Sequence, residues 1–143
     1  MDIRVEVVQE AGRELVDAFG RLLPQLSSTA APLDRAAVER LVACDANTLL
    51  VARTPEAIVG ALVLVLLPLP SGLRARIEDV VVDGAARGHG VAALLTEEAL
   101  RIARTAGART IDLTSRPDRT AANRLYERAG FRRRESTVYR FEG

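Results

Sequence analysis

Residues 75–95, ARIEDVVVDGAARGHGVAALL, constrain the fold of this chain more than any other stretch. Residues 77–82 are mostly β-branched, which favours a strand whose alternate side chains point to opposite faces of a sheet. After Arg87 the sequence changes to Gly-His-Gly, and from Val91 onward apolar residues recur at the 3.6-residue period of a helix. We therefore expect a strand, a glycine-rich turn and a helix, in that order.

The turn between this strand and this helix has the composition of an anion-binding site. Glycines adopt backbone angles that are closed to other residues, and they leave their N–H groups uncovered. The first turn of a helix has N–H donors without intrahelical partners and carries a partial positive charge. Gly88 and Gly90 therefore predict a phosphate-binding loop, although a strand–turn–helix unit of this kind also serves as a plain connector in α/β proteins.

A dinucleotide-binding turn is an alternative interpretation of the same residues. Gly88, Gly90 and Ala93 match the pattern G-x-G-x-x-G/A, and Asp112 lies near the distance expected for a ribose-binding acid. Three features weaken the match. The motif lies past mid-chain, too few residues follow it to build a six-stranded doubly wound sheet, and Asp112 falls inside a predicted strand rather than at its end. A nicotinamide-dependent enzyme stays the less favoured alternative.

The N-terminal part of the chain alternates strand and helix patterns. Alternating polar and apolar residues predict a strand over residues 2–8, and helical spacing predicts a helix over residues 10–23 that Pro24 ends. A small, polar loop should follow over residues 25–32.

A second helix and a hairpin are predicted next. Asp34 has the side chain of a helix N-cap, and Cys44 near the end of that helix is expected to be a core thiol because no positive neighbour is evident. Residues 48–53 and 57–67 predict a hairpin that turns at Thr54-Pro55. The prolines and glycine of residues 68–72 should then break the chain before the strand at residues 77–82.

The C-terminal part completes one mixed α/β domain over residues 1–143. Gly107 should end the central helix, and residues 109–114 predict a strand parallel to the one before that helix. Thr120 can cap a last helix that ends at Gly130. The remaining residues are expected to close the sheet as a hairpin of strands 131–134 and 136–141.

Two motifs in order resemble those of the Gcn5-related N-acetyltransferase (GNAT) superfamily. The pyrophosphate loop of that superfamily is written R/Q-x-x-G-x-G/A, and Arg87, Gly90 and Ala92 fill it. Residues 122–131, ANRLYERAGF, are similar to its second signature of Asn, then Tyr, then Gly-Phe. The resemblance extends over residues 58–141. It implies a mixed, mostly antiparallel sheet flanked by about four helices, acetyl-coenzyme A (acetyl-CoA) as cosubstrate, and no metal.

The resemblance also assigns roles to particular residues. It implies that Tyr126 is a general acid for the departing thiolate and that Glu78 assists as a base. The strand is expected to hold the pantetheine arm of the cofactor, and a backbone N–H near Val80 could polarise the thioester carbonyl. The expected cofactor-binding residues are Val80, Val81, Val82, Arg87, Gly88, His89, Gly90, Val91, Ala92, Asn123 and Tyr126.

Proton affinities distinguish the two catalytic assignments. A thiol with a pKa of about 8.5 and a phenol of about 10 differ by ~1.5 units, or ~2 kcal/mol, so Tyr126 is a reasonable acid. An ammonium of about 10.4 and a glutamic acid of about 4.3 differ by ~6 units, or ~8 kcal/mol. Glu78 can therefore be the base only if its pKa is raised, if water relays the proton, or if the amine binds neutral.

Two other readings of this strand stay open. Glu78 can instead bind the acceptor or pair with Arg74 or Arg76. Asp79 should face away from Glu78 and is the weaker candidate, unless a bulge re-aims it.

Composition narrows the class of partner. The net charge is +1 and all 20 cationic side chains are arginines, 14 of which lie in residues 71–143 with the predicted loop. This balance argues against a nucleic-acid role. A single cysteine fits a reducing, cytoplasmic setting, and the longest apolar stretch, residues 57–67, is too short to span a bilayer. No Ser-His-Asp set or metal-ligand cluster is evident in the sequence.

The acceptor is not specified by any signature in the sequence. The resemblance implies a primary amine of a small molecule or peptide, held by residues 25–32 and 132–136, and it implies a homodimer. Arg116, Arg119 and the arginines of residues 132–134 provide a lead toward a phosphorylated or acidic acceptor. A non-catalytic acetyl-CoA-binding sensor or interaction module is the alternative function.

Overall fold

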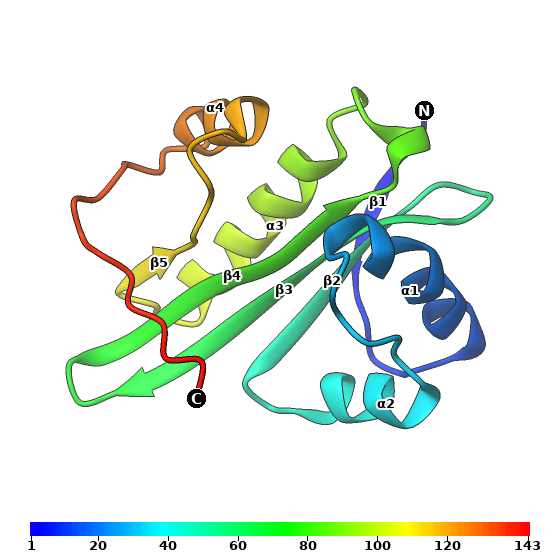
Figure 1. The fold of residues 1–143 in the computed structure, drawn as a ribbon, viewed down its shortest axis with the longest axis horizontal. Coiled ribbons are helices and arrows are strands. Elements are labelled where there is room, and N and C mark those ends of the chain that lie inside the picture. The colour runs from blue at the N-terminus through cyan, green and yellow to red at the C-terminus, as the bar shows by residue number, and fades with distance from the viewer.

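The computed structural model describes all 143 residues and contains one five-stranded sheet with helices on both faces (Figure 1). The strands, which lie side by side in chain order, are β1 (Arg4–Val7), β2 (Asn47–Arg53), β3 (Ile58–Leu69), β4 (Gly72–Val82) and β5 (Thr110–Asp112). Neighbours from β1 to β4 are antiparallel, and β5 is parallel to β4. The predicted mixed, mostly antiparallel sheet is confirmed.

The protein has four helices, and their bounds are α1 (Arg13–Leu26), α2 (Arg35–Ala43), α3 (Val91–Thr105) and α4 (Thr120–Arg128). The first three of them pack on the sheet. A short 3₁₀ turn, η1 (Gly84–Ala86), lies between β4 and α3. The Asp34 carboxylate accepts a hydrogen bond of 2.8 Å from the Ala37 N–H, as expected of an N-cap. Arg119, rather than Thr120, occupies the cap position of α4.

Two apolar clusters hold the layers together, one on each face of the sheet. Leu62 and Leu64 of β3 pack with Leu95 beneath α3, whereas Ala61 of the same strand packs with Leu22 beneath α1 and α2. This division follows from the alternation of side chains along a strand. Each fully buried leucine contributes about 1.5–3 kcal/mol relative to an exposed one. α3 therefore lies on one face of the sheet, and α1 and α2 lie on the other.

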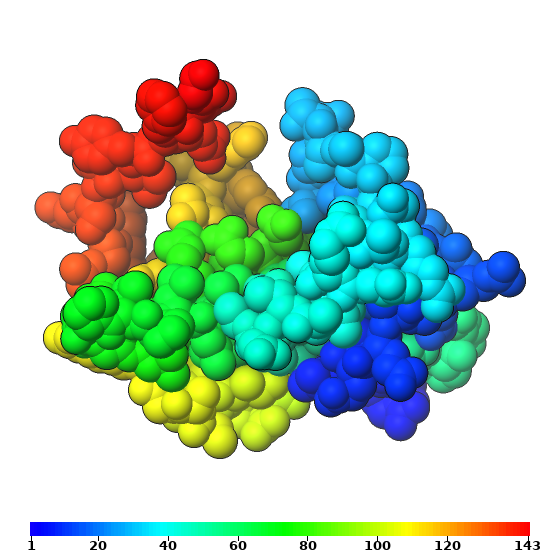
Figure 2. Space-filling view, turned by 90° about the horizontal axis from the view of Figure 1, so that it is seen from below, coloured from blue at the N-terminus to red at the C-terminus, as the bar shows by residue number.

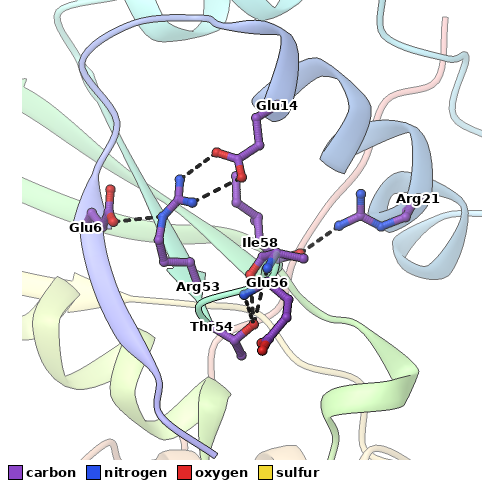
Figure 3. Close-up of polar contacts among 8 residues, drawn as sticks. Glu6, Glu14, Arg21, Arg53, Thr54, Glu56 and Ile58 are labelled. Carbon is purple, nitrogen blue, oxygen red and sulfur yellow. Dashed lines mark hydrogen bonds and ion pairs between the residues drawn. The ribbon is translucent and has the colours of Figure 1, made fainter.

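A charged cluster joins β1, α1 and the end of β2 (Figure 3). The Arg53 guanidinium donates hydrogen bonds of 3.1 and 2.9 Å to the two carboxylate oxygens of Glu14, and its Nε lies 2.8 Å from a Glu6 oxygen. Arg21 of α1 donates a 2.8 Å hydrogen bond to the Ile58 carbonyl at the start of β3. These bonds attach α1 to the sheet at its N-terminal and middle turns.

The prediction that Pro24 ends the first helix is wrong. α1 continues past Pro24 to Leu26, and the Ser27 N–H donates to the Leu23 carbonyl at 2.9 Å. Proline removes the bond that would reach the carbonyl of Gly20, four residues earlier. Gly20 is exposed, so water can hydrate that carbonyl.

Cys44 is exposed, so the prediction of a core thiol is also wrong. α2 ends at Ala43, and Cys44 follows it as the C-cap residue. The fully buried contact of this helix comes from Val38, near its N-terminal end.

The hairpin of β3 and β4 is longer than predicted. The break predicted over residues 68–72 is confined to a turn at residues 70–71, because β3 continues through Pro68 to Leu69 and pairs there with the start of β4 at Gly72. Proline is tolerated at this point because β2 pairs with β3 only as far as Val65, which leaves the later edge without a strand partner.

The predicted C-terminal hairpin is absent. Residues 129–143 form no strand, and the last backbone hydrogen bond of the chain runs from the Phe131 N–H to the Tyr126 carbonyl. The neighbouring strand β5 is three residues long, which offers little edge for a six-residue strand to join. No helix of the protein is both long and apolar enough to cross a bilayer.

Candidate functional site

The sheet splits between β4 and β5. The two strands pair only from Arg74 opposite Thr110 to Arg76 opposite Asp112, while β4 continues to Val82. Beyond the last pair, β4 has no strand neighbour on that side. Such an edge presents backbone N–H and C=O groups that an extended ligand can bind.

A β-bulge lies in β4 along this open edge. Ala61 pairs with Val81 and Val63 pairs with Glu78, so Leu62 alone stands opposite both Asp79 and Val80. Asp79 is the one non-glycine residue with positive φ, at +50°. A bulge of this kind re-aims side chains. The sequence analysis made Asp79 the weaker candidate for the base unless a bulge lay in this strand, and that bulge is present.

The two acids at the bulge have different surroundings. Arg76 Nε donates a 3.1 Å hydrogen bond to Glu78 Oε1, and Arg76 Nη2 donates one of 3.1 Å to Thr114 Oγ1, just after β5. The pairing of Glu78 with Arg76 is thus confirmed. Asp79 has no cation within ion-pair distance. Desolvation first and the Glu78 charge second raise the pKa of Asp79 above its ordinary value.

The glycine-rich turn has the geometry of an anion site. Gly88 and Gly90 have φ of +83° and +76°, a region that side chains disfavour, and Gly90 is the N-cap of α3. The first helical bond of α3 is donated by the Leu94 N–H to the Gly90 carbonyl. The N–H groups of residues 88–93 donate to no acceptor of the protein. These free donors and the exposed Arg87 guanidinium suit a phosphate.

Tyr126 lies on α4 with its side chain largely buried, at 9% exposure. Its ring packs edge-to-face against Phe131 with centroids 5.9 Å apart, and its hydroxyl makes no hydrogen bond within the protein. Burial raises the pKa of the phenol, and the Arg119 charge offsets part of that rise. The hydroxyl is therefore protonated at neutral pH and free to donate to a ligand.

Asn123 shapes the loop that leads into α4. Its Oδ1 accepts a 2.5 Å hydrogen bond from Ser115 Oγ, and its Nδ2 donates one of 3.0 Å to the Arg116 carbonyl. Sequence reasoning placed Asn123 at the cofactor. The contacts of Asn123 within the protein have a structural role, because the loop that Asn123 folds sets where α4 begins and hence where Tyr126 lies.

The surface is hollowed between the C-terminal segment and the loop that follows α1, as Figure 2 shows in red and pale blue. Residues 27–34 make this loop, and Ser27 Oγ stabilises it by accepting hydrogen bonds from the N–H groups of Thr29 and Ala30. The loop over residues 27–34, which overlaps the predicted acceptor-binding segment 25–32, therefore faces the end of the chain across this hollow.

The sequence profile of the acetyltransferase (GNAT) family matches residues 13–131. This chain belongs to that family. The resemblance drawn from the two sequence motifs is thereby confirmed, and the family uses acetyl-CoA. No curated protein sequence matches the chain significantly.

Solved structures share the GNAT fold over nearly the whole chain. An acetyltransferase from Trypanosoma brucei is 26% identical with a TM-score of 0.80, covering 98% of this chain and 99% of its own. A transcriptional regulator from Bacillus halodurans C-125 is 28% identical with a TM-score of 0.78, covering 96% and 99%. AAC(6′)-Iy, in complex with the bisubstrate analogue CoA-S-monomethyl-acetylneamine, is 16% identical with a TM-score of 0.82, covering 100% and 99%.

Sequence reasoning missed two features of this GNAT site. The bulge at Asp79 leaves no mark in the residue pattern, because it arises from how β4 pairs with β3. The contact of Gln25 with the Gly84 N–H at 2.8 Å joins residues far apart in the chain. No group of three or more His, Cys, Asp or Glu side chains is arranged to hold a metal ion.

Proposed function

We propose that this protein is an N-acetyltransferase that moves the acetyl group of acetyl-CoA to a primary amine of a small molecule or peptide. The observation that carries the proposal is that two stretches of free backbone groups follow one another along the chain. The open edge of β4 leads, through η1, directly to the free N–H groups of residues 88–93. An extended pantetheine arm followed by a pyrophosphate matches that order of binding groups.

The backbone of β4 and the loop would hold the cofactor along its length. Strand groups at Val80, Val81 and Val82 would bind the pantetheine arm, and the N–H groups of Gly88, His89, Gly90, Val91 and Ala92 would bind the pyrophosphate. Arg87 would add a charge-assisted contact to a phosphate oxygen. For His89, which is exposed, we assign the contact with the pyrophosphate to the backbone N–H and not to the imidazole ring.

The reaction needs no covalent intermediate on the protein. The neutral amine attacks the thioester carbonyl and forms the C–N bond, the C–S bond breaks, and the thiolate takes a proton from the Tyr126 hydroxyl. The nitrogen gives up its extra proton to a carboxylate or to water, and the Tyr126 phenolate regains a proton from solvent. Because burial raises the pKa of this phenol, the proton transfer is more uphill than the ~1.5 units of the free groups. A hydroxyl without a partner in the protein is nevertheless free to approach the sulfur.

We assign assistance in proton removal from the amine to Glu78. Its ion pair with Arg76 fixes the carboxylate at the open part of β4. Asp79 is the second candidate. Its raised pKa lies closer to the pKa of an ammonium, and it forms no ion pair with a cation. Glu78→Gln and Asp79→Asn distinguish the two candidates. The variant that has lost the base should have the lower kcat, and its loss should be larger below the pKa of the amine, where the amine must give up a proton, than above it.

The experiment that tests the function is amine-dependent release of free thiol from acetyl-CoA. A panel of amino acids, polyamines, amino sugars, aminoglycosides and N-terminal peptides covers the acceptor classes. Release above the rate of hydrolysis by at least one amine, lowered by roughly tenfold or more in Tyr126→Phe, would support the proposal. Acetyl-CoA binding without turnover of any amine would favour a non-catalytic sensor, which the likeness to a transcriptional regulator makes the second candidate.

We also propose a homodimer. Val138, Tyr139 and Phe141 are 71%, 90% and 95% exposed on an extended C-terminal segment that has no backbone hydrogen bond to the rest of the chain. Residues 136–141 have strand-forming composition, and the outer edge of β5 has no partner. A second copy would cover both. Sedimentation should give a dimer, and removal of residues 136–143 should give a monomer.

A further inference from the structure

Gln25, in the last turn of α1, joins that helix to the beginning of the phosphate loop. Its Oε1 accepts a hydrogen bond of 2.8 Å from the Gly84 N–H, and its Nε2 donates one of 3.1 Å to the Arg21 carbonyl within α1. Both ends of the amide are therefore used, and the side chain is held in one orientation although it is exposed.

Gly84 is the residue at which β4 gives way to the loop. The Asp83 N–H donates to the Val59 carbonyl at 2.8 Å, and the Asp83 carboxylate accepts from the Ala85 N–H at 3.2 Å. Together these two bonds attach the start of η1 to β3. The bond from Gly84 to Gln25 is the one side-chain hydrogen bond that ties residues 84–90 to another helix. Beyond η1, the N–H groups of residues 88–90 have no partner.

The chain that follows Gln25 borders the hollow. α1 ends at Leu26, and residues 27–34 follow directly as one wall of the hollow between the loop and the C-terminal segment. Gln25 therefore lies between the loop expected to bind the cofactor and the wall expected to meet the acceptor. A single side chain in this place can hold both in register.

We propose that Gln25 is a positioning residue for coenzyme A, which fixes the phosphate loop through the Gly84 N–H. The inference rests on the proposed function, because it requires that residues 88–93 bind the pyrophosphate. Glycines at positions 88 and 90 make the loop costly to order. Anchoring its first residue lowers the ordering cost that binding must otherwise meet. Loss of one neutral hydrogen bond should weaken binding about threefold to tenfold.

Calorimetric titration of the full chain with coenzyme A and with acetyl-CoA tests this role. Gln25→Met keeps the length of the side chain and removes both hydrogen bonds, so a rise in Kd of about threefold to tenfold is expected. Once an amine substrate is known, KM for acetyl-CoA should rise by the same factor while kcat at saturation is unchanged. That split separates positioning of the cofactor from a direct part in the chemistry.

A second variant separates positioning from a general loss of stability. Gly20 lies five residues earlier on α1, and a Cβ there would meet nothing within 4 Å, so Gly20→Ala should raise the Tm. The double variant Gly20→Ala/Gln25→Met should regain thermal stability and keep the weak binding. Recovery of the wild-type Kd in the double variant would overturn the positioning role.

The outcomes also separate this inference from the function on which it rests. If the wild-type protein binds coenzyme A and Gln25→Met binds it equally well, the positioning role is wrong and the proposed function stands. If the wild-type protein binds neither coenzyme A nor acetyl-CoA, both are overturned, because there is then no cofactor to position.

Discussion

Gly60 of β3 and Val91 of α3 approach so closely that a Cβ atom on Gly60 would lie 2.9 Å from Val91 Cγ1. The same atom would lie 3.2 Å from the Val81 carbonyl oxygen of β4. Gly60 therefore allows the first turn of α3 to rest against the sheet. Because Gly90 immediately precedes that turn, this contact sets the depth of the phosphate loop relative to β4.

Gly60→Ala should consequently affect both stability and cofactor binding. Forcing a methyl group into a packed site costs about 1–3 kcal/mol, and relief by movement of Val91 would displace the start of α3. We expect a lower Tm and a several-fold higher Kd for coenzyme A. Gly20→Ala is the matched control, because its Cβ has open space. Wild-type affinity in Gly60→Ala would show that the depth of α3 does not matter.

Gly90 tests the geometry of the loop itself. At φ +76° a β-branched residue is strained, while no protein atom lies within 4 Å of an added Cβ. Gly90→Val should therefore abolish measurable coenzyme A binding. Gly90→Asn should lose less affinity, because asparagine tolerates left-handed angles. Equal, normal affinity in both variants would mean that the loop is misplaced.

Tyr126→Phe separates packing from chemistry. The hydroxyl makes no hydrogen bond within the protein, and the ring contact with Phe131 is kept, so the Tm should be unchanged. Turnover should fall by roughly tenfold or more at constant Kd for acetyl-CoA, since general acid catalysis typically contributes at least ~10²-fold. Turnover equal to that of the wild type would remove Tyr126 from the mechanism.

The ion pair of Glu14 and Arg53 predicts a pH dependence of stability. Hydrogen bonds from Arg53 lower the pKa of Glu14 in the folded state. A lowered pKa stabilises the fold above the ordinary glutamate value, and this contribution is lost as the pH falls through the folded value. The Glu14 side chain is 57% exposed, so solvent screening limits the effect to about 1 kcal/mol or less.

Urea unfolding of Glu14→Gln measures that contribution. The variant should be less stable than the wild type at pH 7, and the difference should shrink as the pH is lowered from about 5 to about 3. Asp17→Asn, one turn further along α1 and outside the ion pairs, is the matched control for removing a carboxylate from this helix. A difference that grows toward low pH would contradict the assigned sign.

The sequence predicted well where local patterns decide structure. The change from β-branched residues to glycines and then to a helical period placed β4, the loop and α3 correctly, since propensity and burial agree there. The parallel pairing of β5 followed from the short crossover through α3. The Asp34 cap was also predicted correctly, because it involves only the Asp34 side chain and the N–H of Ala37, three residues further along the chain.

The features that sequence did not reveal depend on contacts between distant residues. Whether Pro24 ends α1 depends on access of water to the Gly20 carbonyl, and the bulge at Asp79 depends on pairing with Leu62. The C-terminal segment has a strand pattern, yet a strand forms only where an adequate edge is offered. In a single chain, β5 is too short to offer one.

A thermal melt with acetyl-CoA, run beside NAD, tests the central claim most directly. A ligand at 100 times its Kd adds ~2.7 kcal/mol, which for a domain of this size raises the Tm by roughly 5 to 11 °C. We expect that rise with acetyl-CoA and none with NAD. No shift with saturating acetyl-CoA would contradict the account, and a shift with NAD alone would favour the dinucleotide interpretation of the Gly88 to Ala93 turn.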